Sequence, residues 1–121
     1  HRAHAWWQEN GAHGWASCPL TQNGFVRVTS QPAFLHISAT SNALAKLAQA
    51  IEGTSHDFWA DDVSITDENV FDTQFILGHR QVTDTYLLAL SVKNSGRLVT
   101  FDRSIQLSAV KGAKPENLVI V

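Results

Sequence analysis

Apolar and polar positions follow two different periods along this chain, and the two periods predict helices and short strands in turn. The clearest helix covers 41–51, where apolar side chains recur every three or four residues behind Ser41, a residue that favours helix N-termini. Further helices are predicted over 2–10, from Thr21 onward, from Thr66 to about Leu77, and over 84–95. Short β-prone runs are found at 14–18, 63–65, 97–101 and 118–121.

This alternation predicts the fold class. Short apolar strands that alternate with helices are typical of a parallel sheet covered on both faces. We therefore expect a three-layer α/β domain with a mainly parallel sheet flanked by helices. The 121 residues suit one domain over 1–121, with no internal repeat and no linker long enough to divide it.

Composition narrows the class of protein. With 44% hydrophobic and 17% charged residues, the chain is too apolar for intrinsic disorder. It has no apolar run of about 20 residues and does not open like a signal peptide, so we expect a cytoplasmic protein with no membrane span. The single cysteine, Cys18, lies among apolar neighbours and is interpreted as a buried structural residue. A net charge of −2 does not favour nucleic-acid binding by the whole surface, so any such binding needs a local patch.

Two aspartates are expected to meet at one edge of the sheet. A helix over 84–95 advances about 18 Å, and a strand over 97–101 returns roughly 16–17 Å. With one turn at Gly96 between them, the chain comes back to nearly the level that it left. Asp84 begins the outward helix and Asp102 ends the returning strand, so both should lie at the carboxyl edge, where open α/β folds bind ligands.

This pair has a structural and a chemical interpretation. As structure, Asp84 stabilises the positive end of its helix and Asp102 is an ordinary residue at a strand end. Together the two carboxylates repel unless a cation neutralises them, and a hard divalent cation with oxygen ligands is the simplest remedy. Thr83 and Thr100 flank the pair, and Thr83 is interpreted as the N-cap of its helix.

A third polar segment is predicted at the same edge. Thr21, Gln22 and Asn23 follow the strand at 14–18 and should face the same crevice. Helix capping and turn formation explain these residue types equally well.

The chain resembles PIN-domain proteins, specifically VapC-type toxins of bacterial toxin–antitoxin pairs. Three segments carry the resemblance, and they read CPLTQNGFVRV at 18–28, GHRQVTDTYLLALSVKNSGRLVTFDRSI at 78–105 and LVIV at 118–121. The resemblance implies an endoribonuclease that depends on Mg²⁺ or Mn²⁺, acts on RNA and is silenced by a partner antitoxin. Asp84 matches the aspartate that opens the family's TDxxLLALA helix, and Asp102 matches the aspartate of its TFD strand end.

The resemblance also identifies differences from the family pattern. A first strand with its own aspartate should precede His1, so we expect the 121-residue chain by itself to bind metal weakly and to have little or no nuclease activity. The family's glutamate falls within LTQNG, where Gln22, Asn23 or Gly24 holds the position. We favour Asn23 as a neutral oxygen ligand or a residue that positions water. These amides also leave open a nuclease-inactive PIN scaffold that binds protein or RNA.

Further residues are assigned to binding. Arg80, Arg103 and Thr100 lie beside the aspartates and are predicted to contact RNA, although solvation of a surface explains the arginines as well. Trp6 and Trp7 are adjacent on one helix, so at least one lies off its core-facing side. They are predicted to contact an antitoxin or a second copy in a homodimer. A phosphatase that uses strand-end aspartates is a third interpretation, but the chain has no recognisable phospho-acceptor motif.

Overall fold

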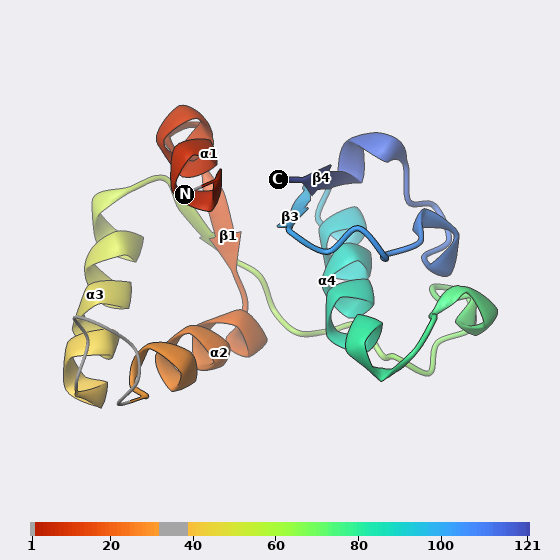
Figure 1. The fold of residues 1–121 in the computed structure, drawn as a ribbon, viewed down its shortest axis with the longest axis horizontal. Coiled ribbons are helices and arrows are strands. Elements are labelled where there is room, and N and C mark those ends of the chain that lie inside the picture. Colours follow the sequence, from red (N-terminus) through yellow and green to blue (C-terminus); the bar gives the residue numbers. More distant parts are fainter. Residues whose placement is uncertain (1, 32–38) are drawn as a thin grey trace. The chain divides into compact units, whose positions relative to one another are not determined.

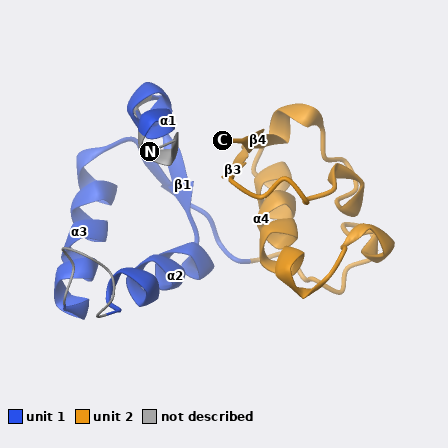
Figure 2. Cartoon of the chain, viewed as in Figure 1, with its two compact units in different colours: residues 1–61 blue, residues 62–121 orange. Residues whose placement is uncertain are grey.

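The computed structural model describes residues 2–31 and 39–121. The chain divides into two compact units, His1–Asp61 and Asp62–Val121 (Figure 2). Each unit is described by itself below. The prediction of one domain over 1–121 stays a prediction.

The first unit is a pair of parallel strands with helices before and between them. Its elements are α1 (Arg2–Asn10), η1 (Gly11–His13), β1 (Trp15–Ser17), α2 (Pro19–Thr29), α3 (Thr40–Gly53) and β2 (His56–Phe58). In the sheet, Trp15 lies opposite His56 and Ser17 lies opposite Phe58. The helices α2 and α3 pack against each other and form the connection between the two strands (Figure 1). A crossover of this kind is what parallel strands require.

The second unit is built around α4. Its elements are η2 (Thr73–Phe75), η3 (His79–Gln81), α4 (Val82–Lys93), β3 (Leu98–Thr100), η4 (Leu107–Ala109), η5 (Pro115–Asn117) and β4 (Leu118–Ile120). The strands β3 and β4 are parallel, with Leu98 opposite Leu118 (Figure 1). The connection between these strands consists of turns and 3₁₀ segments, with no α-helix. The parallel pairing in both units confirms the predicted α/β class.

The core of the second unit surrounds α4. Leu88 and Leu90 are both fully buried although they project about 200° apart around the helix. The helix is therefore covered on more than one side, as its almost continuous apolar sequence suggests. The buried cluster consists of Phe71, Leu88, Ala89, Ile105 and Val110. This packing anchors the middle of α4, the helix whose first turn carries Asp84.

The helix α2 begins earlier than predicted. It starts at Pro19, whereas the sequence suggested Thr21. Proline suits the first position of a helix because its φ is already helical and its missing N–H needs no partner there. Thr21 instead completes the cap: its Oγ1 accepts a hydrogen bond from the Cys18 N–H (2.9 Å) and donates one to the Cys18 carbonyl (3.0 Å). Cys18 itself is only 2% exposed, which confirms a buried cysteine.

The predictions for 63–65 and for a helix from Thr66 to about Leu77 are wrong. Residues 63–65 form no strand, and the helix is replaced by turns and the short η2. Phe71 is the cause, because it enters the core and forms an antiparallel bridge with Val110. The N–H of Asp72 donates to the Ala109 carbonyl, and the Val70 carbonyl accepts from the Lys111 N–H, so these groups are not available to a helix.

The strand β2 was missed because His56–Phe58 has no apolar alternation. Pairing with β1 makes it a strand.

The helix 84–95 is confirmed with shifted ends. It begins at Val82 behind Gln81, so Thr83 lies inside the helix and is not its N-cap. At the other end Ser95, and not Gly96, takes the left-handed conformation, with a φ of 58°. The Ser95 N–H donates to the Val92 carbonyl (3.2 Å) and the Gly96 N–H to the Ser91 carbonyl (2.7 Å). These two bonds form a Schellman motif, which closes the last turn of α4.

Candidate functional site

The second unit brings Asp84 and Asp102 together. Asp84 lies in the first turn of α4, and Asp102 follows two residues after β3. The Thr100 hydroxyl joins them: it donates to Asp84 Oδ2 at 3.5 Å and accepts a hydrogen bond from the Asp102 N–H at 3.1 Å. The meeting of helix start and strand end that the segment lengths predicted is therefore present within this unit.

A hydrogen-bond network fixes the carboxylate of Asp102. Its Oδ1 accepts hydrogen bonds from the Ser104 N–H (2.8 Å) and from the Ser104 hydroxyl. The Ser104 hydroxyl in turn accepts a hydrogen bond from Gln81 Nε2 at 2.8 Å. Within the described residues, no hydrogen bond engages the second carboxylate oxygen, Oδ2. One oxygen of Asp102, Oδ1, is thus held by the protein.

The two carboxyl groups have opposite pKa shifts. Burial raises the pKa of Asp84, the negative charge of Asp102 raises it further, and the Thr100 hydroxyl lowers it in part. The hydroxyl and the backbone N–H of Ser104 lower the pKa of Asp102. Asp102 therefore loses its proton first, and its charge opposes the ionisation of Asp84. A cation between the two groups would relieve this repulsion.

The oxygen atoms of Asp84 and Asp102 suit a hard divalent cation, although they supply only two carboxylate ligands. Carboxylate oxygens are the ligands that Mg²⁺ and Mn²⁺ prefer. In residues 2–31 and 39–121, no group of three or more His, Cys, Asp or Glu side chains is placed to hold a metal ion. Asp84 and Asp102 would therefore be the carboxylate ligands from this unit. A Mg²⁺ ion held by one or two carboxylates keeps several of its waters, so two such ligands agree with its chemistry.

The predicted polar segment lies on α2, in the first unit. Asn23 is exposed and Gly24 has no side chain, whereas Gln22 is partly buried. Gln22 Nε2 donates to the hydroxyl of Ser17 at 2.9 Å, and this hydroxyl lies 2.7 Å from Nε2 of His56. Of the three alternatives, Gln22 is the one that the fold holds at the end of β1. The role proposed for Asn23 stays a prediction.

Sequence reasoning missed Ser17 and His56. Ser17 is only 6% exposed and its hydroxyl joins the other two side chains of this network. His56 lies in a segment without strand periodicity, so nothing in the local sequence indicated that it would lie beside β1. Ser17 and His56 are 39 residues apart in sequence, and the parallel pairing of β1 with β2 brings them together.

The residues assigned to RNA binding lie close to the aspartates in sequence, within the second unit. Arg80 is exposed on η3, and Arg103 is exposed directly after Asp102. Thr100 is partly buried, and its hydroxyl proton is directed to Asp84. The two hydrogen bonds of Thr100 thus join Asp84 to Asp102. That Arg80, Arg103 and Thr100 contact RNA stays a prediction.

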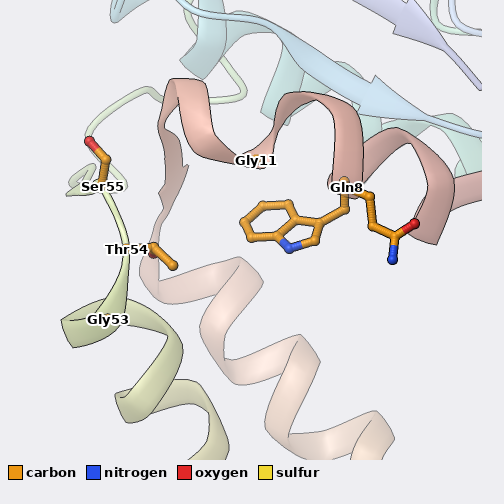
Figure 3. Close-up of a pocket in the computed structure, with 6 residues that line it drawn as sticks. Gln8, Gly11, Gly53, Thr54 and Ser55 are labelled. Atoms are coloured by element: carbon orange, nitrogen blue, oxygen red, sulfur yellow. The ribbon is translucent and has the colours of Figure 1, made fainter.

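The adjacent tryptophans lie on α1. Trp6 is partly buried, and Trp7 is 39% exposed with its ring edge-on to Trp15 at 5.6 Å between centroids. Trp7 lines a shallow hollow with Gln8, Gly11, Gly53, Thr54 and Ser55 (Figure 3). The Thr54 hydroxyl there is already engaged, because it accepts from Trp15 Nε1 and donates to the Ala50 carbonyl. The hollow has no titratable side chain in its lining, and the partner contact predicted for the tryptophans stays a prediction.

Comparison with known proteins identifies relatives over almost the whole chain. Ribonuclease VapC44 of Mycobacterium tuberculosis is 49% identical over 117 residues, which cover 97% of this chain and 82% of the relative. Ribonuclease VapC38 of the same species is 42% identical over 107 residues, or 86% of this chain and 72% of the relative. Ribonuclease VapC39 is 38% identical over 111 residues, or 91% of this chain and 80% of the relative.

Two other comparisons gave no match. No family model matches the chain, and no solved structure matches it. Among the described residues, no helix is both long and apolar enough to cross a membrane. The identities and coverage of the curated relatives are sufficient by themselves, and they confirm the resemblance drawn from the three sequence segments: the chain belongs to the VapC-type PIN-domain ribonuclease family.

Proposed function

We propose that this protein is a cytoplasmic, Mg²⁺- or Mn²⁺-dependent endoribonuclease toxin that hydrolyses RNA phosphodiester bonds and is inhibited by a cognate antitoxin. The observation that supports this most directly is the pair Asp84 and Asp102, joined by Thr100 at the end of β3. The relatives at 38–49% identity are named ribonucleases, which agrees with the proposal. A homodimer, with Trp6 and Trp7 in a partner contact, is part of the same proposal.

Asp84 and Asp102 are the residues that would hold the ion. A bound Mg²⁺ or Mn²⁺ lowers the pKa of water and neutralises charge on a phosphate. Thr100 orients Asp84 through its hydroxyl, and the two donors of Ser104 hold Oδ1 of Asp102 and lower the pKa of this carboxyl group. We propose that the exposed Arg80 and Arg103 contact RNA phosphates, for which the guanidinium fork is well suited.

The second candidate function is a nuclease-inactive scaffold that binds RNA or protein. The neutral amides on α2 favour it, because the residues after β1 provide no carboxylate. This alternative predicts full-length protein that binds RNA and antitoxin but does not cleave RNA with either ion.

Cleavage assays with two aspartate variants test the proposal. In full-length protein with Mn²⁺, Asp84→Asn and Asp102→Asn should each reduce the rate of RNA cleavage by about 100-fold or more, because each change removes a carboxylate that holds the ion. The control is Asp57→Asn, the same change at an exposed residue of β2. Circular dichroism should show that all three variants fold. Cleavage at the wild-type rate by either site variant would contradict the proposed role of these aspartates.

Two further points of the proposal need separate measurements. Addition of the antitoxin should stop cleavage by wild-type protein, and continued cleavage would contradict inhibition. That the 121-residue chain by itself cleaves RNA weakly stays a prediction, and the rate of RNA cleavage by this chain with Mn²⁺ tests it.

A further inference from the structure

We propose that Ser104 and Gln81 are positioning residues, which hold the carboxylate of Asp102 in one orientation and leave its Oδ2 as the oxygen available to a cation. The inference rests on the proposed function, because it assigns a role to two residues beside the proposed ligand. Neither residue belongs to the motif letters that identified the aspartates.

The direction of each hydrogen bond follows from the chemistry of the groups. The side-chain nitrogen of Gln81 is a donor only, so the Ser104 hydroxyl must accept at this contact of 2.8 Å. A hydroxyl has one proton, and here it is left for Asp102 Oδ1. The backbone N–H of Ser104 donates to the same oxygen at 2.8 Å. Asp102 Oδ1 is thus saturated by two donors, and rotation of the carboxylate would break both bonds.

The network reaches beyond the local turn. A turn from Asp102 to Ser104 needs only the bond between the Ser104 N–H and the Asp102 side chain. Gln81 comes from a segment 23 residues away and immediately precedes α4, the helix that carries Asp84. The bond from Gln81 therefore ties the start of α4 to the segment that carries Asp102. Gln81, Ser104 and Asp102 are all partly buried, which limits competition by water.

Three variants separate positioning from simple turn formation. Ser104→Ala removes the hydroxyl, Ser104→Thr retains it, and Gln81→Leu removes the donor to it. The matched controls are Ser108→Ala and Gln106→Leu, which change exposed residues of the same types in the same unit. The Kd for Mn²⁺ is measured by titration calorimetry without RNA, and kcat and KM for RNA cleavage are measured on the same full-length preparations.

The expected result is a loss of metal affinity that the conservative variant restores. Changes to residues that orient metal ligands typically cost 10–100-fold in affinity or activity. We expect Ser104→Ala and Gln81→Leu to weaken Mn²⁺ binding by about 10-fold and to lower kcat with little change in KM. Ser104→Thr and both controls should stay within about twofold of wild type. The unfolding temperature shows whether Ser104→Ala folds. If it does not fold, the Mn²⁺ affinities of Gln81→Leu and Ser104→Thr decide whether the positioning role holds.

Several outcomes would overturn the inference. Wild-type Mn²⁺ affinity in Ser104→Ala and Gln81→Leu would do so, and so would an equal loss of affinity in Ser104→Thr. Wild-type protein that does not bind Mn²⁺ overturns both this inference and the metal-dependent mechanism. Wild-type protein that binds Mn²⁺ but cleaves no RNA contradicts only the nuclease function, and the affinities of the variants then decide the positioning role.

Discussion

At the scale of single residues, the site combines one carboxylate that resists ionisation with one that favours it. Burial and the charge of Asp102 raise the pKa of Asp84, whereas the donors of Ser104 lower the pKa of Asp102. The folded protein is therefore destabilised by ionised Asp84 and stabilised by ionised Asp102. Such opposed shifts in one site are a common property of functional carboxylates.

Substitution of the two aspartates should change the stability of the metal-free protein in opposite directions. At pH 7, Asp84→Asn should raise the unfolding temperature, because it removes a charge that the fold disfavours. Asp102→Asn should lower it, because the charge-assisted bonds from Ser104 are lost. Thermal unfolding in a metal chelator measures both changes. An unfolding temperature lowered by Asp84→Asn would contradict the raised pKa.

The pH dependence of these changes follows from the signs of the pKa shifts. For Asp84, the stability contributed by the protonated form is fully present below the ordinary pKa of 3.8 and is lost as pH rises through the raised pKa. The gain from Asp84→Asn should therefore shrink when the pH falls from 7 towards 3.8. For Asp102, the contribution is present above 3.8 and is lost as pH falls through the lowered pKa. Thermal unfolding repeated from pH 7 down to the acid limit of solubility checks both trends.

A variant at Thr100 tests the link between the two carboxylates. Thr100→Val keeps the shape of the side chain but leaves the Asp102 N–H without its acceptor and Asp84 without its donor. We expect a loss of about 1 kcal/mol in the free energy of unfolding and weaker Mn²⁺ binding. Denaturant unfolding and calorimetry measure these effects, with Thr100→Ser as the control that retains the hydroxyl. Equal Mn²⁺ affinities of the Val and Ser variants would contradict the link.

At the scale of elements, α4 and β3 were predictable, whereas the neighbouring segments were not. The helix has a long apolar sequence and β3 is short and β-prone, so local pattern and tertiary packing agree. Residues 66–77 look like a helix start, but Phe71 enters the core and pairs with Val110. In β2 the reverse occurs, because His56–Phe58 becomes a strand only through its partner β1.

The end of α4 provides a test of backbone strain. Ser95 has a φ of 58°, a conformation that costs L-residues about 1–2 kcal/mol relative to glycine. Ser95→Gly should therefore raise the free energy of unfolding by roughly 0.5–1 kcal/mol, after allowance for the greater freedom of glycine in the unfolded chain. Denaturant unfolding measures the change. A control is Gly53→Ala, at a helix end where an added Cβ meets no atom within 4 Å and φ is not positive. A Ser95→Gly variant that is less stable than wild type would contradict the proposed backbone strain at Ser95.

At the scale of the whole molecule, the family is secure and the chemistry depends on a small part of the surface. A net charge of −2 over 121 residues does not attract RNA, so binding must come from local groups such as Arg80 and Arg103. The two carboxylates of the second unit add negative charge in the same region of the sequence. A cation that neutralises these two carboxylates would therefore affect both the stability of the protein and its binding to RNA.

Mn²⁺ should stabilise the full-length protein through these two aspartates. A ligand that binds only the folded state at 100 times its Kd adds about 2.7 kcal/mol to the free energy of unfolding. We expect the unfolding temperature of wild type to rise with Mn²⁺ concentration, and that of a variant carrying both Asp84→Asn and Asp102→Asn to stay constant. Thermal unfolding over a Mn²⁺ series measures this. An equal rise in the double variant would place the ion elsewhere.

The amino-acid sequence alone was sufficient for the α/β class, for the helix that carries Asp84 and the strand that precedes Asp102, and for the family, because these depend on local periodicity and on motif letters. The tertiary structure decided the features that depend on contacts between distant segments. These are the pairing of His56–Phe58 with β1, the network of Ser17, Gln22 and His56, and the bond from Gln81 to Ser104 that fixes Asp102. Hydrogen bonds between residues 23 or 39 positions apart have no signature in local sequence, since packing alone places their donors and acceptors together.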